Sequence, residues 1–170
     1  MHDLTLCVHH PAVSHDGFAS LAVPTYLAST IVYDDAESFA RRKQRGPDGY
    51  SYGLQGTPTT RTLEAQITAL HGGVRTVLAP SGQGAVALVM LAVLVPGDHV
   101  LIPDTVYPPV RDFCINYLAP RGITFTAYDP LLGEKIGSVI DDRTRLIWVE
   151  SPGSGTMEVQ DLPAISRVAK

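Results

Sequence analysis

The sequence is short of charged residues. Only 18% of its 170 residues are Asp, Glu, Lys or Arg, against roughly a quarter in an average soluble domain, and the net charge is −4. A protein that binds nucleic acid by displacing counterions from phosphates needs a basic face. The one basic cluster, from Arg41 to Arg45, is short and is typical of a solvated helix end or loop. We therefore expect no nucleic-acid partner.

Long apolar runs and cysteines are also scarce. The longest apolar run, Ala85 to Val95, is well below the roughly 20 residues that span a bilayer, and the N-terminus lacks the pattern of a secretory signal. The two cysteines, Cys7 and Cys114, are far apart and match no metal or redox spacing, and no histidines stand at ligand spacing. We expect no membrane contact, no metal site and a cytoplasmic location.

The chain changes character near residue 57. Residues 1–56 have no sustained periodicity and are interpreted as an extended arm, whereas residues 57–170 alternate short apolar strands with helices. Thr57-Pro58 is a helix start and Gly72-Gly73 a helix end. The expected strands are 74–79, 99–102, 123–128 and 146–150, and the expected later helices are 84–95, 109–118, 133–140 and 162–170. This alternation predicts an α/β fold with a parallel sheet covered on both faces.

Ligands of such sheets bind beyond the carboxyl ends of the strands, so the loops that follow strands are the candidate sites. Pro80 to Gly84 precedes a buried helix, and its glycines and the helix start suit an anion such as phosphate. A tight turn would use the same glycines. Tyr107, in the loop after the next strand, could present its ring to a planar ligand or pack against the adjacent prolines. The loop 150–158 is rich in glycine and hydroxyls and is either a ligand loop or a turn.

A dinucleotide-binding module is an alternative. Gly82, Gly84 and Ala87 match the spacing of the dinucleotide fingerprint, and Asp104 lies where a ribose-binding acid would stand. This hypothesis predicts an NAD-binding Rossmann domain, but it gives the first seventy residues no role.

Several motifs together resemble one family. They occur in order along nearly the whole chain: Tyr52-Gly53 with Gly56-Thr57-Pro58-Thr59, Pro80-Ser81-Gly82, Pro96-Gly97-Asp98-His99, Tyr107 with Arg111-Asp112-Phe113-Cys114, Tyr128-Asp129-Pro130-Leu131, and Glu150-Ser151-Pro152-Gly153-Ser154. This series resembles the transsulfuration enzymes, which use pyridoxal 5'-phosphate. The resemblance implies an arm, residues 1–56, that makes oligomer contacts. Residues 57–170 would then be the first part of an incomplete large domain, a three-layer α/β/α structure of the fold-type I, aminotransferase-like kind. In the family's sheet, strand 99–102 lies between strands 123–128 and 146–150. Strand 74–79 is separated from these by later strands, so in this chain we expect it to lose its neighbours.

The resemblance also implies roles for matching residues. Gly82 and Gln83 would donate backbone N–H groups to the cofactor phosphate, and Tyr107 would stack on the pyridine ring. Tyr52 would reach the phosphate of a neighbouring protomer, which implies a homo-oligomer, a dimer of dimers in the complete enzyme. Leu54 occupies a position where many members have an arginine, so one charged phosphate contact is absent.

The segment 150–159 selects a branch of the family. Its Glu-Ser-Pro-Gly-Ser and Thr-Met-Glu-Val pieces are similar to the cystathionine β-lyases, whereas synthases and γ-lyases usually have Ser-Pro-Thr-Asn there. The implied reaction is β-elimination of cystathionine, an amino-acid thioether, to homocysteine, pyruvate and ammonia in methionine biosynthesis. A γ-synthase or γ-lyase of the same family is the alternative.

The chemistry of the family also needs a lysine that forms a Schiff base with the cofactor. The chain has three lysines, Lys43, Lys135 and Lys170, and none follows a strand of the sheet in a position to enter the site. We expect the lysine to lie beyond Lys170, so no catalytic residue is assigned in this chain. The chain is expected to be an N-terminal portion that is inactive and poorly soluble or loosely folded alone; a non-catalytic remnant is the alternative.

Overall fold

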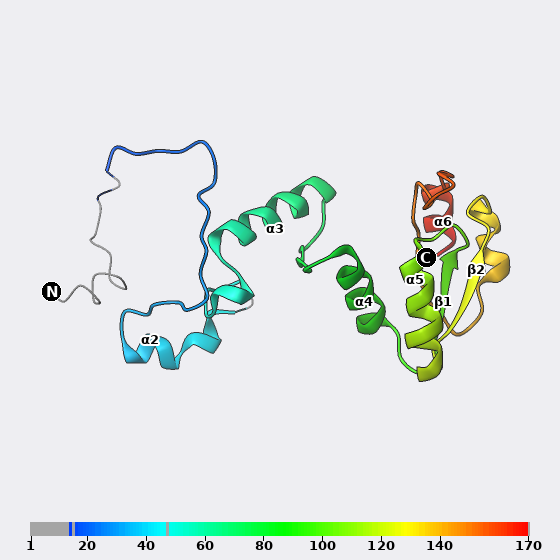
Figure 1. Ribbon diagram of the computed structural model, residues 1–170, viewed down its shortest axis with the longest axis horizontal. Helices are drawn as coiled ribbons and strands as arrows, with labels where there is room; N and C mark the ends of the chain where they lie inside the picture. Colours follow the sequence, from blue (N-terminus) through cyan, green and yellow to red (C-terminus); the bar gives the residue numbers. More distant parts are fainter. Residues whose placement is uncertain (1–13, 15, 47, 170) are drawn as a thin grey trace. The chain divides into compact units, whose positions relative to one another are not determined.

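The computed structural model describes residues 14, 16–46 and 48–169, so Cys7 and Lys170 lie outside the described residues. The chain divides into two compact units, residues 1–78 and residues 79–170 (Figure 1). The sequence predicts a different division, an arm for oligomer contacts over 1–56 and the first part of a large domain over 57–170. These roles stay predictions. Among the described residues, no helix is long and apolar enough to cross a membrane.

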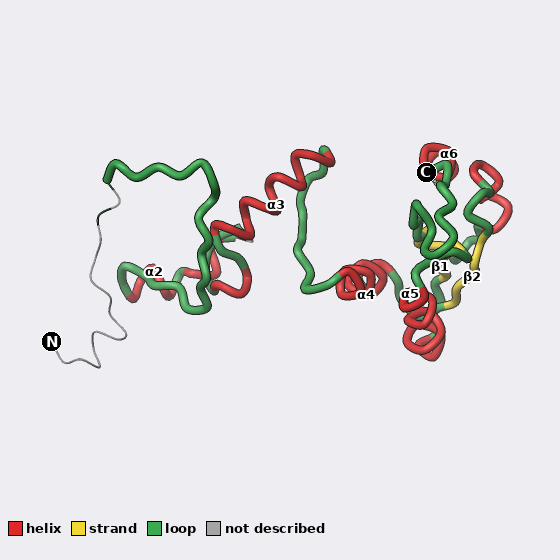
Figure 2. The backbone as a smooth tube through the Cα atoms, turned by 45° about the horizontal axis from the view of Figure 1, so that its top comes forward, coloured by secondary structure: helices red, strands yellow, loops and turns green. Residues whose placement is uncertain are grey.

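The described residues of the first unit before residue 57 have little regular structure (Figure 2). It contains helix α2, Ala36–Ala40, two short 3₁₀ turns at Arg42–Arg45 and Gly53–Gln55, and helix α3, Pro58–His71. Thr57 begins α3 in a capping box with Thr60, and Gly72 ends it in the left-handed conformation. The predicted start and end of this helix are confirmed.

The predicted strand 74–79 is wrong. These residues form no strand, and the side chains of Val74 and Val77 are exposed, at 102% and 65%. A β-strand exists only when a neighbouring strand accepts and donates its backbone hydrogen bonds. None of the described strands pairs with residues 74–79, so the apolar, β-branched sequence remains a loop.

The second unit contains a parallel sheet of three strands: β1, His99–Pro103; β2, Thr124–Tyr128; and β3, Thr144–Ile147. Their order is β2-β1-β3. The predicted position of the strand that begins at His99, between the other two, is confirmed.

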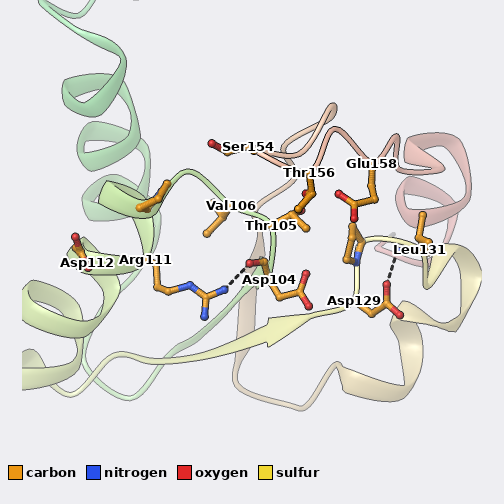
Figure 3. A pocket seen from close by; sticks show the side chains of 13 residues that line it. Asp104, Thr105, Val106, Arg111, Asp112, Asp129, Leu131, Ser154, Thr156 and Glu158 are labelled. Carbon is orange, nitrogen blue, oxygen red and sulfur yellow. Dashed lines mark hydrogen bonds between the residues drawn. The ribbon is translucent and has the colours of Figure 1, made fainter.

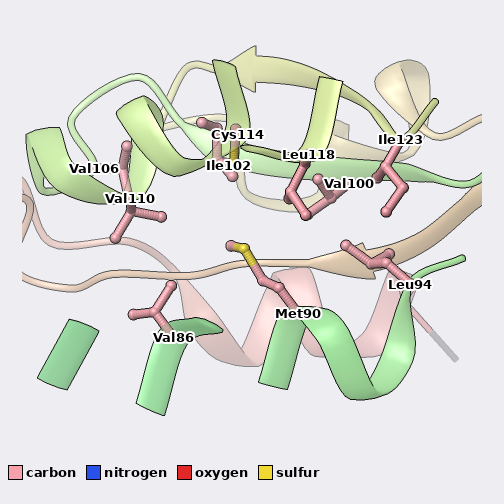
Figure 4. Packing of buried hydrophobic residues seen from close by; sticks show 10 residues of the cluster. All are labelled: Val86, Met90, Leu94, Val100, Ile102, Val106, Val110, Cys114, Leu118 and Ile123. Atoms are coloured by element: carbon pink, nitrogen blue, oxygen red, sulfur yellow. The ribbon is translucent and has the colours of Figure 1, made fainter. Parts of the chain in front are cut away.

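Helices cover both faces of this sheet. Side chains of β1 alternate, so Val100 and Ile102 face one apolar cluster and Leu101 faces the other. The first cluster includes residues of α4, Gly82–Val93, and α5, Pro108–Phe113 (Figure 4). The second lies under α6, Leu162–Val168, and the 3₁₀ segment Gly133–Val139. The predicted three-layer α/β/α architecture, an incomplete fold-type I domain, is confirmed.

The predicted helix 109–118 changes its hydrogen-bond pattern midway. After α5 the chain continues as a π-helix, Cys114–Leu118, and a 3₁₀ turn, Ala119–Arg121. Pro120 has no N–H group, and its ring would clash with the carbonyl of Asn116 in a continued α-helix. The wider turn avoids that clash while Cys114 and Leu118 stay buried in the core.

Candidate functional site

The start of α4 presents backbone N–H groups. Ser81 caps this helix, and its Oγ accepts a hydrogen bond from the N–H of Gly84 at 3.0 Å. Gly82 and Gln83 are the first two residues of the helix, where N–H groups have no partner within the helix. A Cβ atom on Gly82 would meet no other atom within 4 Å, so the space beside this residue is open.

The side chain of Gln83 connects this helix start to the next helix. Its Nε2 donates to the carbonyl oxygen of Pro109, in the first turn of α5, at 3.2 Å. Its Oε1 is buried and has no hydrogen-bond partner among the described residues. The start of α4 and the start of α5 therefore lie together.

Tyr107 lies directly before α5, in the loop that follows β1. It is the N-cap residue of the helix, its side chain makes no capping hydrogen bond, and 51% of its surface is exposed. Its backbone N–H donates to Oε1 of Glu150, the residue three positions beyond β3, at 3.0 Å. The carboxylate of Glu150 thus holds the backbone of Tyr107 while the aromatic ring remains accessible.

The loop 150–158 is joined to the Tyr107 loop a second time. The N–H of Ser154 donates to the carbonyl oxygen of Thr105 at 2.8 Å, and the N–H of Gly153 donates to that of Glu158 at 2.9 Å. A Cβ atom on Gly153 would lie 2.6 Å from Oγ1 and 2.9 Å from Cβ of Thr105. Only glycine allows the two loops to approach this closely without movement of Thr105.

A buried glutamine fixes the backbone behind the loop. Nε2 of Gln160 donates to the carbonyl oxygen of Glu150 at 2.8 Å, and its N–H donates to Oγ of Ser151 at 2.9 Å. The hydroxyl of Tyr128, on β2, donates to Oε1 of Gln160 at 2.8 Å. Burial raises the pKa of Tyr128 to about 12, so this hydroxyl remains a donor at neutral pH.

A hollow of about 710 Å³ lies beside these loops at the carboxyl ends of β1 and β2 (Figure 3). Arg111, one of its lining residues, donates to the carbonyl oxygen of Asp104 at 2.6 Å. Carboxylates outnumber cations in its lining. The lining residues are Asp104, Thr105, Val106, Pro108, Arg111, Asp112, Asp129, Pro130, Leu131, Ser154, Gly155, Thr156 and Glu158.

The structure brings together three of the four residues predicted to bind the cofactor. Gly82 and Gln83 lie beside the loop of Tyr107 in the second unit, through the hydrogen bond to Pro109. Tyr52 lies in the first unit, where it is 44% exposed and its hydroxyl is 3.4 Å from Oγ of Ser29. The roles of all four residues stay predictions.

Two residues that organise this site were missed at the level of sequence. Glu150 belongs to the loop singled out from sequence, but nothing there relates its carboxylate to a residue 43 positions earlier. Gln160 follows the same loop and carries no motif. The one signal that could single out Glu150 is its place at the carboxyl end of the expected strand 146–150, where ligand-binding residues of such sheets gather.

The dinucleotide fingerprint lacks its structural context. That motif requires a strand directly before the glycine turn, and residues 74–79 form none. Gly82 and Gly84 lie inside the first turn of α4, although Asp104 does follow β1 as the hypothesis required. The geometry therefore does not support an NAD-binding Rossmann module.

The residues present do fit pyridoxal phosphate. Its phosphate needs N–H donors in open space, which the start of α4 offers at Gly82 and Gln83. Its ring needs an accessible aromatic face, which Tyr107 offers. The buried, unpartnered Oε1 of Gln83 also leaves a hydrogen-bond acceptor for a donor from outside the described residues.

Several curated relatives of the chain are lyases by name. A Saccharomyces cerevisiae protein named putative cystathionine beta-lyase is 44% identical over 147 residues, which is 86% of this chain and 42% of the relative. The Escherichia coli cystathionine beta-lyase MetC is 41% identical over 139 residues, 81% of this chain and 35% of the relative. An L-methionine gamma-lyase of Fusobacterium nucleatum is 32% identical over 160 residues, 94% of this chain and 40% of the relative.

Solved structures of related enzymes match the chain in fold at lower sequence identity. MetB from Corynebacterium glutamicum superposes with a TM-score of 0.78 at 25% identity, over 99% of this chain and 42% of that chain. Cystathionine gamma-lyase from Lactobacillus plantarum, complexed with L-serine, gives a TM-score of 0.74 at 28% identity, over 87% of this chain and 36% of that chain. The chain thus spans less than half the length of each of these relatives.

A family model covers nearly the whole sequence. The model described as "Cys/Met metabolism PLP-dependent enzyme" matches residues 4–170. Pyridoxal 5'-phosphate is therefore the expected cofactor. From its motifs, its fold and this match, the chain belongs to the pyridoxal-phosphate-dependent enzymes of cysteine and methionine metabolism.

Proposed function

We propose that this protein is a carbon–sulfur lyase that splits cystathionine by β-elimination. The observation that carries the proposal is the hydrogen bond between Gln83 and Pro109, which joins a helix start suited to a phosphate to the loop of an exposed tyrosine. Identity of 41–44% to proteins named cystathionine beta-lyase, against 32% to a methionine gamma-lyase, favours the β-type reaction.

The start of α4 binds the phosphate in this proposal. The N–H groups of Gly82 and Gln83 donate to the phosphate oxygens, and the positive end of the helix dipole favours the negative charge. Because Gly82 has no side chain, the phosphate can approach the backbone at residue 82 closely. These contacts do not involve Leu54, which stands where many members have arginine and is 75% exposed.

Tyr107 orients the ring. Its exposed side chain would stack on the pyridine ring and shield that face from water. The bound cofactor supplies an electron sink that lets the bond between the β-carbon and sulfur of the substrate break. The balanced reaction converts cystathionine and water into homocysteine, pyruvate and ammonia.

The remaining parts of the enzyme are proposed to come from outside this chain. The covalent lysine and the groups that bind the substrate would lie in sequence that the longer relatives have and this chain does not, since it spans 42% of the yeast protein. Tyr52 would serve a neighbouring protomer of a homotetramer. We also propose a cytoplasmic enzyme of methionine biosynthesis, and a chain that is inactive alone.

The products test this proposal. The protein encoded by the full reading frame is purified, loaded with pyridoxal phosphate and incubated with cystathionine, and the oxo acid is identified. Pyruvate with homocysteine is the expected result. The product 2-oxobutyrate with cysteine would instead identify a γ-lyase, and a cofactor-loaded protein that releases neither oxo acid would contradict the proposal.

A further inference from the structure

We propose that Glu150 is a positioning residue, which acts through Tyr107 to set the height of the bound cofactor ring. This inference rests on the proposed function, because it requires that Tyr107 faces the ring. Glu150 itself has no assigned role in that function.

The argument begins with what holds Tyr107. Its half-exposed side chain makes no capping hydrogen bond, so the position of the ring depends on the backbone at residue 107. That backbone stands at a helix start, where the N–H has no partner within the helix. Oε1 of Glu150 accepts from this N–H at 3.0 Å, a charge-assisted hydrogen bond between segments 43 residues apart.

The second step is the rigidity of Glu150. Its carbonyl oxygen accepts from Nε2 of Gln160 at 2.8 Å, and Gln160 is only 4% exposed. Oε1 of Gln160 accepts in turn from the hydroxyl of Tyr128, which is 2% exposed. A continuous path of hydrogen bonds therefore leads from the core under the sheet to the backbone of Tyr107.

The third step is that the other contacts of this loop do not replace the bond. Ser154 donates to the carbonyl oxygen of Thr105, two residues earlier, and Gln83 donates to that of Pro109, two residues later. Both are bonds to carbonyl oxygens, and neither satisfies the N–H of Tyr107. The carbonyl oxygen of Tyr107 accepts from the N–H of Val110 at 2.9 Å, which holds only the carbonyl side of this residue. Loss of the Glu150 carboxylate leaves the loop tied at both sides but leaves the N–H of Tyr107 without its partner.

Three variants of Glu150 separate the effect of side-chain length from the effect of the negative charge. They are tested in the protein encoded by the full reading frame. Glu150→Gln keeps an oxygen at the same distance without charge, Glu150→Asp keeps the charge but is one methylene too short, and Glu150→Ala removes both. Cofactor dissociation constants, the visible absorbance of the bound cofactor, and kcat and KM with cystathionine are measured. Glu134→Ala, which breaks an exposed ion pair with Arg167, is the matched control.

We expect Glu150→Ala and Glu150→Asp to weaken cofactor binding about tenfold and to lower kcat more than they raise KM. The cofactor dissociation constant and kcat of Glu150→Gln should remain within about threefold of the parent values, and those of the control should be unchanged. If Glu150→Ala fails to fold, the comparison of Glu150→Asp with Glu150→Gln tests the inference. Equal defects in the Asp and Gln variants would overturn the inference, as would parent-like values in both.

A double-mutant cycle tests whether Glu150 acts through Tyr107. In a Tyr107→Ala background, Glu150→Ala should cause no further loss of cofactor affinity, because the aromatic ring of Tyr107 that Glu150 positions is gone. Multiplicative losses would overturn the inference. A parent protein that binds the cofactor but releases no oxo acid would refute the proposed function, and the cofactor-binding cycle would still test Glu150 and Tyr107 directly.

Discussion

The side-chain amide of Gln83 and the carbonyl oxygen of Pro109 lie 3.2 Å apart and form a hydrogen bond. Gln83 belongs to the helix start that offers N–H groups to an anion, and Pro109 follows the exposed ring of Tyr107 by two residues. One hydrogen bond thus couples the part of the site suited to a phosphate with the part suited to a planar ring. Movement of either segment would displace the other.

A methyl group at residue 82 should impair cofactor binding without impairing folding. A Cβ atom there meets nothing within 4 Å, so Gly82→Ala should change the free energy of unfolding by no more than about 0.5 kcal/mol. If the backbone contacts a phosphate, the same methyl group should weaken cofactor binding about tenfold. Thermal unfolding and a cofactor titration on the same variant check this. Unchanged cofactor affinity would show that the phosphate binds elsewhere.

A methyl group at residue 153, unlike one at residue 82, should destabilise the fold. In Gly153→Ala the new Cβ atom would lie 2.6 Å from Oγ1 of Thr105, so we expect a destabilisation of about 1–3 kcal/mol. Removing the opposing side chain in Thr105→Gly should recover part of this loss in the double variant. Chemical denaturation of the four proteins of this cycle gives the answer. Independent, additive effects would mean that the two residues do not contact one another.

The thiol of Cys114 should be inert in the folded protein. Burial raises its pKa from 9.0 to about 11, so the neutral thiol is the form that the fold favours. Stability from this group is therefore present below pH 9 and is lost as pH rises through about 11. In a Cys7→Ser background, a thiol reagent at pH 8 should modify Cys114 only as fast as the protein unfolds. Rapid modification of native protein would contradict the burial.

The 170-residue chain alone should self-associate. Helix α4 buries Val86 and Met90, yet Leu88 and Leu91 are 50% and 48% exposed. Large apolar side chains that are half exposed on one helix favour association between chains. Sedimentation velocity should show oligomers or aggregates, and Leu88→Glu with Leu91→Glu should reduce them. A monomer with a cooperative unfolding transition would be the opposite outcome.

Local signals in the sequence predict much of the fold. Thr57-Pro58 and Gly72 define α3, because capping and left-handed glycine act within a few residues. The strands at 99, 123 and 146 are short apolar runs, and their order follows from the family resemblance. Residues 74–79 have the same composition and form no strand, because a strand depends on a partner that the sequence of the strand does not specify.

The candidate site was predicted in part. Gly82, Gln83 and Tyr107 are predicted because they belong to family motifs, and of the three only Tyr107 lies in a loop that follows a strand of the structure. The carboxylate of Glu150 and the amide of Gln160 are not predicted, since their partners are 43 and 32 residues away in the sequence. Such contacts arise only when the sheet brings distant loops to one edge, which periodicity and propensity do not report.

We propose that this chain binds the phosphate and the ring of the cofactor, and that the covalent lysine lies outside residues 1–170. The most direct test traps the cofactor in the protein of the full reading frame by borohydride reduction and maps the pyridoxyl group by peptide mass spectrometry. We expect the label on a lysine outside residues 1–170. A label on Lys43, Lys135 or Lys170, the three lysines of this chain, would contradict this assignment.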